Sequence, residues 1–194
     1  TRRSASIIDW EAEGITSLAA FGDTYRDQRE YTGYTIKKYS PLCYADGTSA
    51  SKEDGSGDFQ LSNHQDYVIM RYADVLLMAA ELGSPKAQEY FDEVRKRAYT
   101  SEGTLSANYS QLPVTKENIM QERRLEFAFE SINYWDLLRQ GVDYAASKLA
   151  LSEKQVYSGG IVDFITISAD RIRTTKGLSQ IPYNQITLSN GTLV

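Results

Sequence analysis

Residues 67 to 82, YVIMRYADVLLMAAEL, constrain the fold more than any other stretch, because their apolar side chains recur at helical spacing. The apolar positions follow i, i+3, i+4, i+7, i+8 and i+11, which is the pattern of a helix with one wide buried face. We expect that face to consist of Ile69, Tyr72, Ala73, Leu76, Leu77 and Ala80. Such a helix gains most of its stability by packing this face against another element.

A second amphipathic segment follows after a very short connection. PKAQEYFDEVRKRA, which starts at Pro85, repeats the apolar stripe at Ala87, Tyr90, Phe91, Val94 and Ala98. Gly83 suits the position just after a helix end, Ser84 suits an N-cap and Pro85 suits the first helical position. So short a connection predicts two antiparallel helices packed as a hairpin.

A further pair of helices is predicted beyond a polar loop. Thr115 can cap a helix that contains QERRLEFAFE (121–130), and NYWDLLRQG follows and stops at Gly141. The expected apolar face of the first of these helices is Leu125, Ala128, Phe129 and Ile132. Residues 67–141 therefore read as two helical hairpins in series. Ala87-x-x-x-Phe91 also fits one element of a tetratricopeptide repeat.

The flanking parts of the chain lack this helical period. Residues 1–66 are rich in turn-forming residues, with one predicted short strand in TGYTIKKYS (32–40). Residues 142–194 are expected to contain a short helix and then an extended segment that includes the strand-like IVDFITI. The predicted fold class is mainly α, with tetratricopeptide-like helical hairpins, long irregular loops and minor β, and we expect one domain over residues 1–194.

Composition excludes several classes of function. The chain of 194 residues carries a net charge of −5 with its basic residues interspersed, which is unlike a nucleic-acid-binding surface. One cysteine and one histidine leave no internal disulfide and no Cys/His metal site. No apolar run approaches the roughly 18 residues that a membrane-spanning helix needs. We therefore expect no cofactor, no bound metal and no nucleic-acid partner.

The charge density of QERRLEFAFE raises the question of catalysis. Glu122, Glu126 and Glu130 are spaced four apart, so neighbouring carboxyls lie about 6 Å apart at Cβ, near the separation in retaining glycosidases. Catalytic pairs, however, come from elements that face each other across a cleft. We expect instead a structural ion-pair network of Arg71, Asp74, Glu122, Arg123, Arg124 and Glu126, and no catalytic residues. An acidic glycosidase remains the alternative interpretation.

The tyrosines suggest where a ligand could bind. The chain has 14 of them, and several fall in irregular or strand-like segments of the first 66 residues. A tyrosine ring can stack on the apolar face of a sugar while its hydroxyl makes a hydrogen bond. The candidate ligand-binding residues are Tyr31, Tyr34, Tyr39 and Tyr44. The alternative is that these rings only cover the helical hairpins.

Four ordered segments carry a family resemblance. RYADVLLMAAE (71–81), EYFDEVRKRAY (89–99), ENIMQERRLEFAFESINYWDLLRQG (117–141) and IPYNQI (181–186) resemble successive landmarks of the SusD/RagB family. Members of that family are glycan-binding outer-membrane lipoproteins of Bacteroidetes. TGYTIKKYS is similar to the segment that precedes the first landmark, so the resemblance covers about residues 25 to 190.

The resemblance implies a function and a location. Family members are non-catalytic, capture oligosaccharide or peptide at the cell surface, and close over a TonB-dependent transporter of the SusC type. It implies that this chain is the C-terminal portion of a longer protein, with the missing N-terminal portion as a partner and as the carrier of the lipid anchor, since Cys43 lies mid-chain. The implied location is the outer membrane at the cell surface.

Two points limit what the resemblance transfers. The connection from Ala80 to Pro85 is shorter than is usual in the family, so any partner contact at that hairpin tip is in question. The family's glycan-contacting residues vary with the ligand and lie outside these motifs, so none is transferred. A helical-repeat scaffold that binds only protein is the alternative function.

Overall fold

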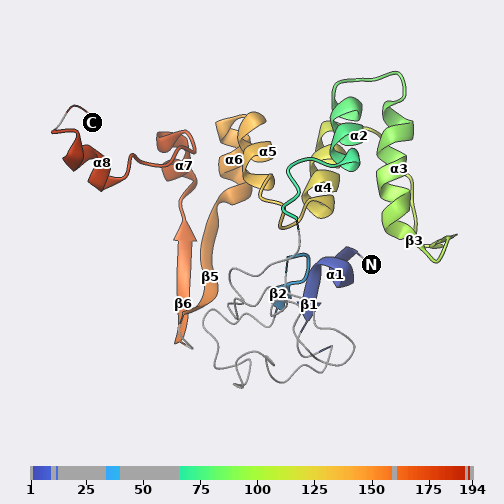
Figure 1. The fold of residues 1–194 in the computed structure, drawn as a ribbon, viewed down its shortest axis with the longest axis horizontal. Coiled ribbons are helices and arrows are strands. Elements are labelled where there is room, and N and C mark those ends of the chain that lie inside the picture. The colour runs from blue at the N-terminus through green and yellow to red at the C-terminus, as the bar shows by residue number, and fades with distance from the viewer. Residues whose placement is uncertain are drawn as a thin grey trace. The chain divides into compact units, whose positions relative to one another are not determined.

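The structure is a computed structural model, and it describes residues 2–9, 12, 34–39, 66–158, 161–190 and 192. Two compact units make up the chain. Unit 1 comprises Thr1–Asn133 with Tyr157–Ile161, and unit 2 comprises Tyr134–Val156 with Val162–Val194. Most of the described secondary structure is helical, with short paired strands, as the sequence predicts (Figure 1).

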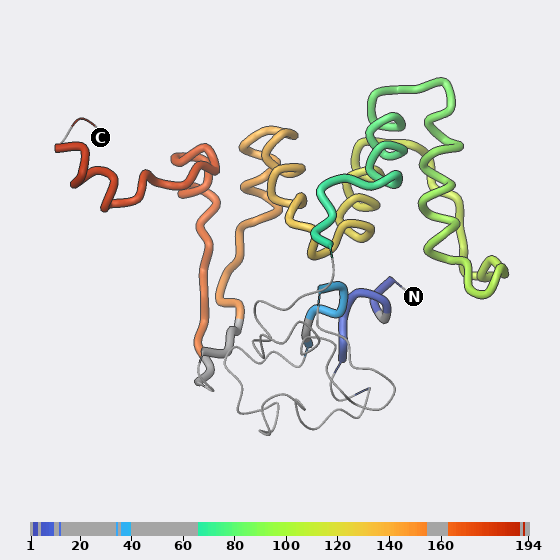
Figure 2. The backbone as a smooth tube through the Cα atoms, viewed as in Figure 1, coloured from blue at the N-terminus to red at the C-terminus, as the bar shows by residue number. Residues whose placement is uncertain are grey.

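The predicted hairpin of unit 1 is formed by α2 (Tyr72–Glu81) and α3 (Ala87–Tyr99), which pack together and run in opposite directions (Figure 2). Gly83, at φ 77°, ends α2 in the left-handed region that favours glycine. The Ser84 amide donates to the Ala79 carbonyl (3.1 Å), and the Gly83 amide donates to the Ala80 carbonyl (3.2 Å). This paired arrangement satisfies carbonyls that the helix end leaves without intrahelical partners.

The start of α3 differs slightly from the prediction. The helix begins at Ala87, with Lys86 as its N-cap and no side-chain capping bond. The Ser84 hydroxyl instead accepts from the Lys86 amide (3.3 Å), within the turn that precedes the helix. Pro85 therefore lies in that turn and not at the first helical position.

The core of unit 1 lies between α2, α3 and α4 (Lys116–Glu126). Its buried side chains are Leu76, Leu77, Ala80, Phe91, Val94, Ile119 and Phe127. The expected stripe on α2 is confirmed from Ala73 onward, but Ile69 and Tyr72 are 84% and 67% exposed. The reason is that α2 begins only at Tyr72, so the helical period does not extend back to Ile69.

The predicted apolar face of the helix containing QERRLEFAFE is wrong at Leu125 and Phe129, whereas Ile132 packs against the core as expected. Thr115 caps α4 as predicted, accepting from the Asn118 amide (3.2 Å). The helix ends at Glu126, however, and Phe127 is buried, whereas Leu125 and Phe129 are 46% and 39% exposed. Because Glu122, Arg123 and Glu126 share the inward face of α4 with Ile119 and Met120, part of that face is polar.

Unit 1 also contains short β elements. β1 (Ile7–Asp9), which follows α1 (Arg2–Ser6), pairs antiparallel with β2 (Tyr34–Ile36) inside the predicted strand segment. β3 (Thr100–Ser101) and β4 (Thr104–Leu105) form a tight hairpin in the segment predicted to be a loop. Glu102 and Gly103 join them with positive φ angles of 48° and 78°, as a two-residue turn matched to the strand twist requires.

Unit 2 contains four helices and most of a strand pair. Its elements in order are α5 (Asn133–Arg139), α6 (Val142–Leu149), β5 (Leu151–Ser158), β6 (Ile161–Ile167), α7 (Ala169–Thr175) and α8 (Tyr183–Leu188). The first residue of α5, the last two of β5 and the first of β6 belong to unit 1. Of these, α6 packs against α7, and β5 pairs with β6. The strand-like character of IVDFITI is confirmed by β6. The extended segment expected near the C-terminus is not, because α8 forms there.

Candidate functional site

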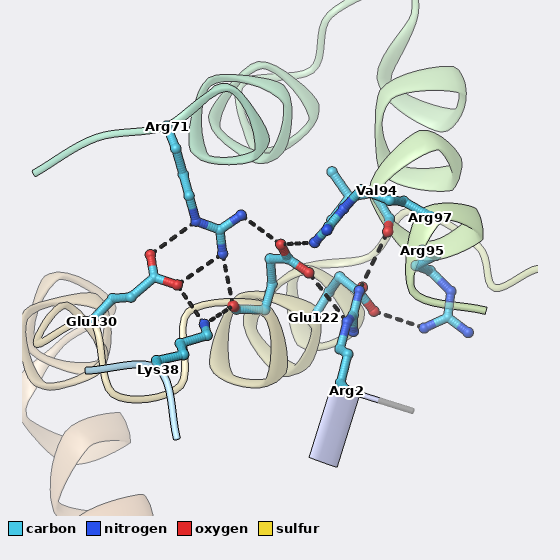
Figure 3. A network of polar contacts seen from close by, with 9 residues as sticks. Arg2, Lys38, Arg71, Val94, Arg95, Arg97, Glu122 and Glu130 are labelled. Atoms are coloured by element: carbon cyan, nitrogen blue, oxygen red, sulfur yellow. Dashed lines mark hydrogen bonds and ion pairs between the residues drawn. The ribbon is translucent and has the colours of Figure 1, made fainter. Parts of the chain in front are cut away.

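Unit 1 contains a cavity of about 1140 Å³. Its lining comes from α1, from residues 38–39 and 66–71, from the end of α3 with the β3–β4 hairpin, and from α4 with Glu130. Ligand pockets in proteins typically enclose roughly 300–1,000 Å³, so this cavity is large enough for a small-molecule ligand. One wall of it is a cluster of charged side chains around α4, which Figure 3 shows from close by.

Glu126 is the centre of this charged cluster. Its carboxylate is almost fully buried and contacts three guanidinium groups. Arg71 Nη1 lies 2.5 Å from Oε1, Arg2 Nε lies 3.1 Å from Oε2, and Arg97 also donates to Oε1. Arg71 donates to the Glu126 carbonyl as well (2.7 Å), at the C-terminal end of α4. Positive charge at a helix C-terminus is favoured, because the unsatisfied carbonyls there carry partial negative charge.

Glu130 forms the second node, just beyond the end of α4. Arg71 donates to it twice, from Nε to Oε2 (2.9 Å) and from Nη2 to Oε1 (3.0 Å), and Lys38 Nζ lies 2.6 Å from Oε1. Burial opposes ionisation of Glu130, but the hydrogen bonds from Arg71 and Lys38 outweigh it and hold the pKa of this carboxyl below its usual value. Burial also opposes the charged form of Arg71, which lowers its pKa, but the hydrogen bonds of Arg71 to Glu130 and Glu126 outweigh burial and raise the pKa.

Glu122 forms the third node and is the most deeply buried, at 1% exposure. Arg95 Nη1 donates to its Oε2 (2.8 Å), and Arg2 pairs with its Oε1. Arg95 also donates to the Ser110 carbonyl (3.2 Å). Removing one member of such a buried pair leaves an uncompensated charge, so this part of the cluster stabilises the packing of α3 on α4.

The Phe127 ring connects the charged cluster to the apolar core. The Arg71 guanidinium lies 4.5 Å from its centroid, and the Arg123 guanidinium lies 5.1 Å from it. Arg123 Nη1 also donates to Asp74 Oδ1 (2.6 Å), which joins α4 to the first turn of α2. Cation–π contacts and ion pairs therefore fix the same two arginines.

The network residues named from the sequence fall into three groups. Arg71 and Glu126 line the cavity, Glu122 is buried in the same cluster behind them, and Asp74 pairs with Arg123, whose guanidinium also lies over Phe127. Arg124 lies outside the cluster. Its side chain is exposed, because it points away from the face of α4 that carries the buried Arg123 and Glu126.

The network named from the sequence lacks four cations of the cluster, Arg2, Lys38, Arg95 and Arg97. Arg2 and Lys38 lie 120 and 92 residues from their Glu122 and Glu130 partners, so no local spacing relates them. Arg95 and Arg97 flank the apolar stripe of α3, but that spacing alone does not identify their partners on α4. The position of Arg97 in the last turn of α3 is the one signal that could have placed it.

Two of the four tyrosines named as ligand-binding candidates can be placed. Tyr39 lines the cavity and stacks on Tyr67, with ring centroids 6.1 Å apart and 26° between planes. Tyr34, on β2, is 52% exposed, with the Arg3 guanidinium 5.4 Å from its ring. Tyr31 and Tyr44 lie outside the described residues.

A further tyrosine belongs to the site although the sequence did not single it out. Tyr99, at the end of α3, lines the cavity and packs edge to face against Tyr109, with centroids 5.7 Å apart. Within the described ranges, the side chains form no group of three or more His, Cys, Asp or Glu suited to a metal ion. No helix in those ranges is long and apolar enough to cross a membrane.

Known proteins of similar sequence are described as SusD-like. "SusD-like protein P38" of Formosa agariphila is 26% identical in an alignment of 161 positions, which covers 69% of this chain and 32% of that protein. "SusD-like protein P2" of the same organism is 37% identical over 83 residues, 38% of this chain and 16% of that protein. The chain therefore spans about a third or less of the length of these relatives.

A solved structure shares the fold. Surface glycan-binding protein A from Bacteroides thetaiotaomicron aligns with a TM-score of 0.66 at 24% identity, over 100% of this chain and 37% of that one. The model of the SusD family matches residues 15–194. The chain therefore belongs to the SusD family, as its ordered sequence landmarks predict.

Proposed function

We propose that this chain is the C-terminal part of a non-catalytic, cell-surface protein that binds oligosaccharide and delivers it to a TonB-dependent outer-membrane transporter. The observation that carries the proposal is the cavity of unit 1, where tyrosine rings and a rigid set of charged side chains face the same space. Family membership and the shared fold support it.

The cavity has the mixture of groups that a sugar needs. Tyr39 and Tyr99 both line it, and each ring is held by a second tyrosine, Tyr67 or Tyr109. A ring held in place by stacking loses little freedom when a sugar stacks on it. The hydroxyls of a sugar can accept hydrogen bonds from guanidinium groups at the wall, such as Arg97, and donate to carbonyls nearby.

The surroundings of the three glutamates in the cluster favour a binding function over glycoside hydrolysis. Each of them already contacts at least two cations: Arg2 and Arg95 at Glu122, three arginines at Glu126, and Arg71 and Lys38 at Glu130. A general acid must be protonated at the working pH. The lowered pKa of Glu130 opposes that role.

The delivery step and the cell-surface location rest on the family. In this proposal the lipid anchor lies on the part of the protein that precedes these residues, and that part also contributes to transporter docking. The short turn from Glu81 to Ala87 limits how much the tip of the α2–α3 hairpin can contribute to such a contact.

Affinity electrophoresis tests the proposal directly. The protein is run through native gels that contain one polysaccharide each, from a panel that covers neutral and acidic backbones. Retardation in at least one gel, without release of reducing ends, is the expected result. Uniform mobility across the panel, together with co-purification of a transporter, would favour a protein-binding scaffold instead. Release of reducing sugar that Glu126→Gln abolishes would show a hydrolase.

A further inference from the structure

We propose that the cavity of unit 1 selects acidic glycans, and that Arg97 at its rim pairs with a carboxylate or sulfate group of the ligand. This inference rests on the function proposed above and adds the class of ligand. It starts from the distribution of charge in the cavity, which differs from that of the chain as a whole.

Basic side chains outnumber acidic ones along the cavity wall. The described lining includes five basic residues, Arg2, Arg3, Lys38, Arg71 and Arg97, against three acidic ones, Asp66, Glu126 and Glu130. The whole chain has the opposite balance, with 21 basic and 26 acidic residues and a net charge of −5. An excess of one sign inside a concave site of low dielectric concentrates its field on the ligand.

Exposure separates the two signs further. The side chains of Glu126 and Glu130 are 2% and 7% exposed, so a ligand in the cavity has little access to their oxygens. Arg97 and Arg3, in contrast, are 64% and 62% exposed. Among the exposed charges of the lining, Arg3 and Arg97 stand against Asp66, so the surface that a ligand meets is still positive.

The acidic groups near the cavity, Asp9 and Asp66, offset only part of its positive charge. Arg3 pairs with Asp9 at 2.6 Å, and the carboxylate of Asp9 offsets that guanidinium in part. Asp66 is an exposed acid on the cavity lining. Arg97 is the exposed cation whose carboxylate partner is already shared, because Arg2 and Arg71 both contact Glu126 as well.

Arg97 is therefore suited to exchange or share its partner. Two other guanidinium groups still compensate Glu126 when Arg97 turns toward a ligand. A guanidinium offers several parallel N–H donors that match a carboxylate or sulfate, and such charge-assisted pairs are stronger than neutral hydrogen bonds. Carboxylate and sulfate share this chemistry, so the experiment must separate them.

The test uses oligosaccharide pairs that differ only in charge. Isothermal titration calorimetry measures binding of oligogalacturonate against its methyl ester, and of a sulfated galactan oligosaccharide against its desulfated form. Each pair is measured at about 0.05 M and about 0.5 M salt, since salt screens exposed charges. The matched variants are Arg97→Gln and Arg124→Gln, both of which replace an exposed arginine of unit 1, and only the first lines the cavity.

The expected result is that one charged form binds at least about tenfold more tightly than its neutral form at low salt, and that Arg97→Gln removes most of that difference, as charge-assisted bonds require. Arg124→Gln should behave like the unaltered protein. The pair in which the charged form binds more tightly shows whether the cavity prefers carboxylate or sulfate. Equal binding of charged and neutral forms would overturn this inference while glycan binding stands. Binding of none of the four sugars would overturn the inference and count against the proposed function too.

Discussion

Arg71 and Glu130, 59 residues apart in the sequence, face each other as a two-pronged ion pair, with Nε–Oε2 and Nη2–Oε1 distances of 2.9 and 3.0 Å. The same guanidinium lies over the Phe127 ring and bonds the Glu126 carboxylate and carbonyl. Arg71 precedes α2, and its partners lie at and beyond the end of α4. This side chain therefore connects the start of α2 to the end of α4 at the cavity.

The shape of the Arg71 contact gives the first prediction. Arg71→Lys keeps the positive charge but loses the paired N–H donors and the stacking on Phe127. Arg71→Met also removes the charge, so that Lys38 becomes the one described cation in contact with Glu130. Breaking a buried pair by removing one partner costs about 3–5 kcal/mol, and the partial exposure of Arg71 places Arg71→Met at or below the lower end of that range. Urea denaturation measures the loss.

The control for this prediction is Arg124→Met, because Arg124 is an exposed arginine on α4. Its free energy of unfolding should change by no more than about 0.5 kcal/mol, as is usual for a surface substitution. Arg71→Lys should fall between the two. Equal stability of Arg71→Met and Arg124→Met would show that the cluster does not hold the helices together.

The pKa of Glu130 gives a prediction about pH. Its pKa is lowered from 4.5 in the folded protein, so the ion pairs stabilise the fold above about pH 4.5 and that contribution is lost as the pH falls through the folded pKa. Glu130→Gln should therefore be less stable than the unaltered protein at about pH 7, and the difference should shrink toward about pH 3.

Urea denaturation at a series of pH values measures this difference. Glu93→Gln is a suitable control, because Glu93 is an exposed glutamate in the interior of α3, away from the helix ends. Its effect should be small at every pH. A difference between Glu130→Gln and the unaltered protein that stays constant from neutral to acid pH would contradict the assigned ionisation.

Two glycines give a prediction about unit 2. Gly177 has a φ of 70°, and a Cβ placed on it would lie 2.3 Å from Leu138 Cδ2. Gly83 in unit 1 has a φ of 77°, with nothing within 4 Å of such a Cβ. Gly83→Ala should cost about 1 kcal/mol for backbone conformation alone. Gly177→Ala should cost more, about 2–3 kcal/mol, because Leu138 must also move.

Thermal or urea unfolding of both variants checks this comparison. The Leu138→Ala change supplies the control, since it removes the clashing methyl groups. In the Leu138→Ala background, the cost of Gly177→Ala should fall toward that of Gly83→Ala. An unchanged cost in both backgrounds would show that Leu138 does not press on this turn.

Local signals in the sequence predicted the local structure well. Gly83 ends α2 and Thr115 caps α4, because both roles depend on backbone conformation and on neighbours within a few residues. The ordered landmarks also predicted the family, since each depends on residue identity and not on packing.

The inward face of α4 could not be read in the same way. An apolar pattern favoured Leu125 and Phe129, but Glu122 and Glu126 face inward because Arg2, Arg71 and Arg97 arrive from distant segments to neutralise them. A buried carboxylate is stable only with such partners, and their arrival depends on tertiary structure. For the same reason the sequence could name Tyr39 but could not show that it shares a cavity with Tyr99.

The central claim, that the cavity of unit 1 binds a glycan, is tested most directly by titrating the best-retained polysaccharide into Tyr39→Ala and into Tyr183→Ala by calorimetry. Tyr39 lines the cavity, whereas Tyr183 is a 79% exposed ring in unit 2 and serves as the matched control. Loss of one stacking ring should weaken binding about 5- to 100-fold in Tyr39→Ala, as expected when a buried aromatic contact is removed. Tyr183→Ala should bind like the unaltered protein. Unchanged affinity in a folded Tyr39→Ala protein would contradict the placement of the site in this cavity.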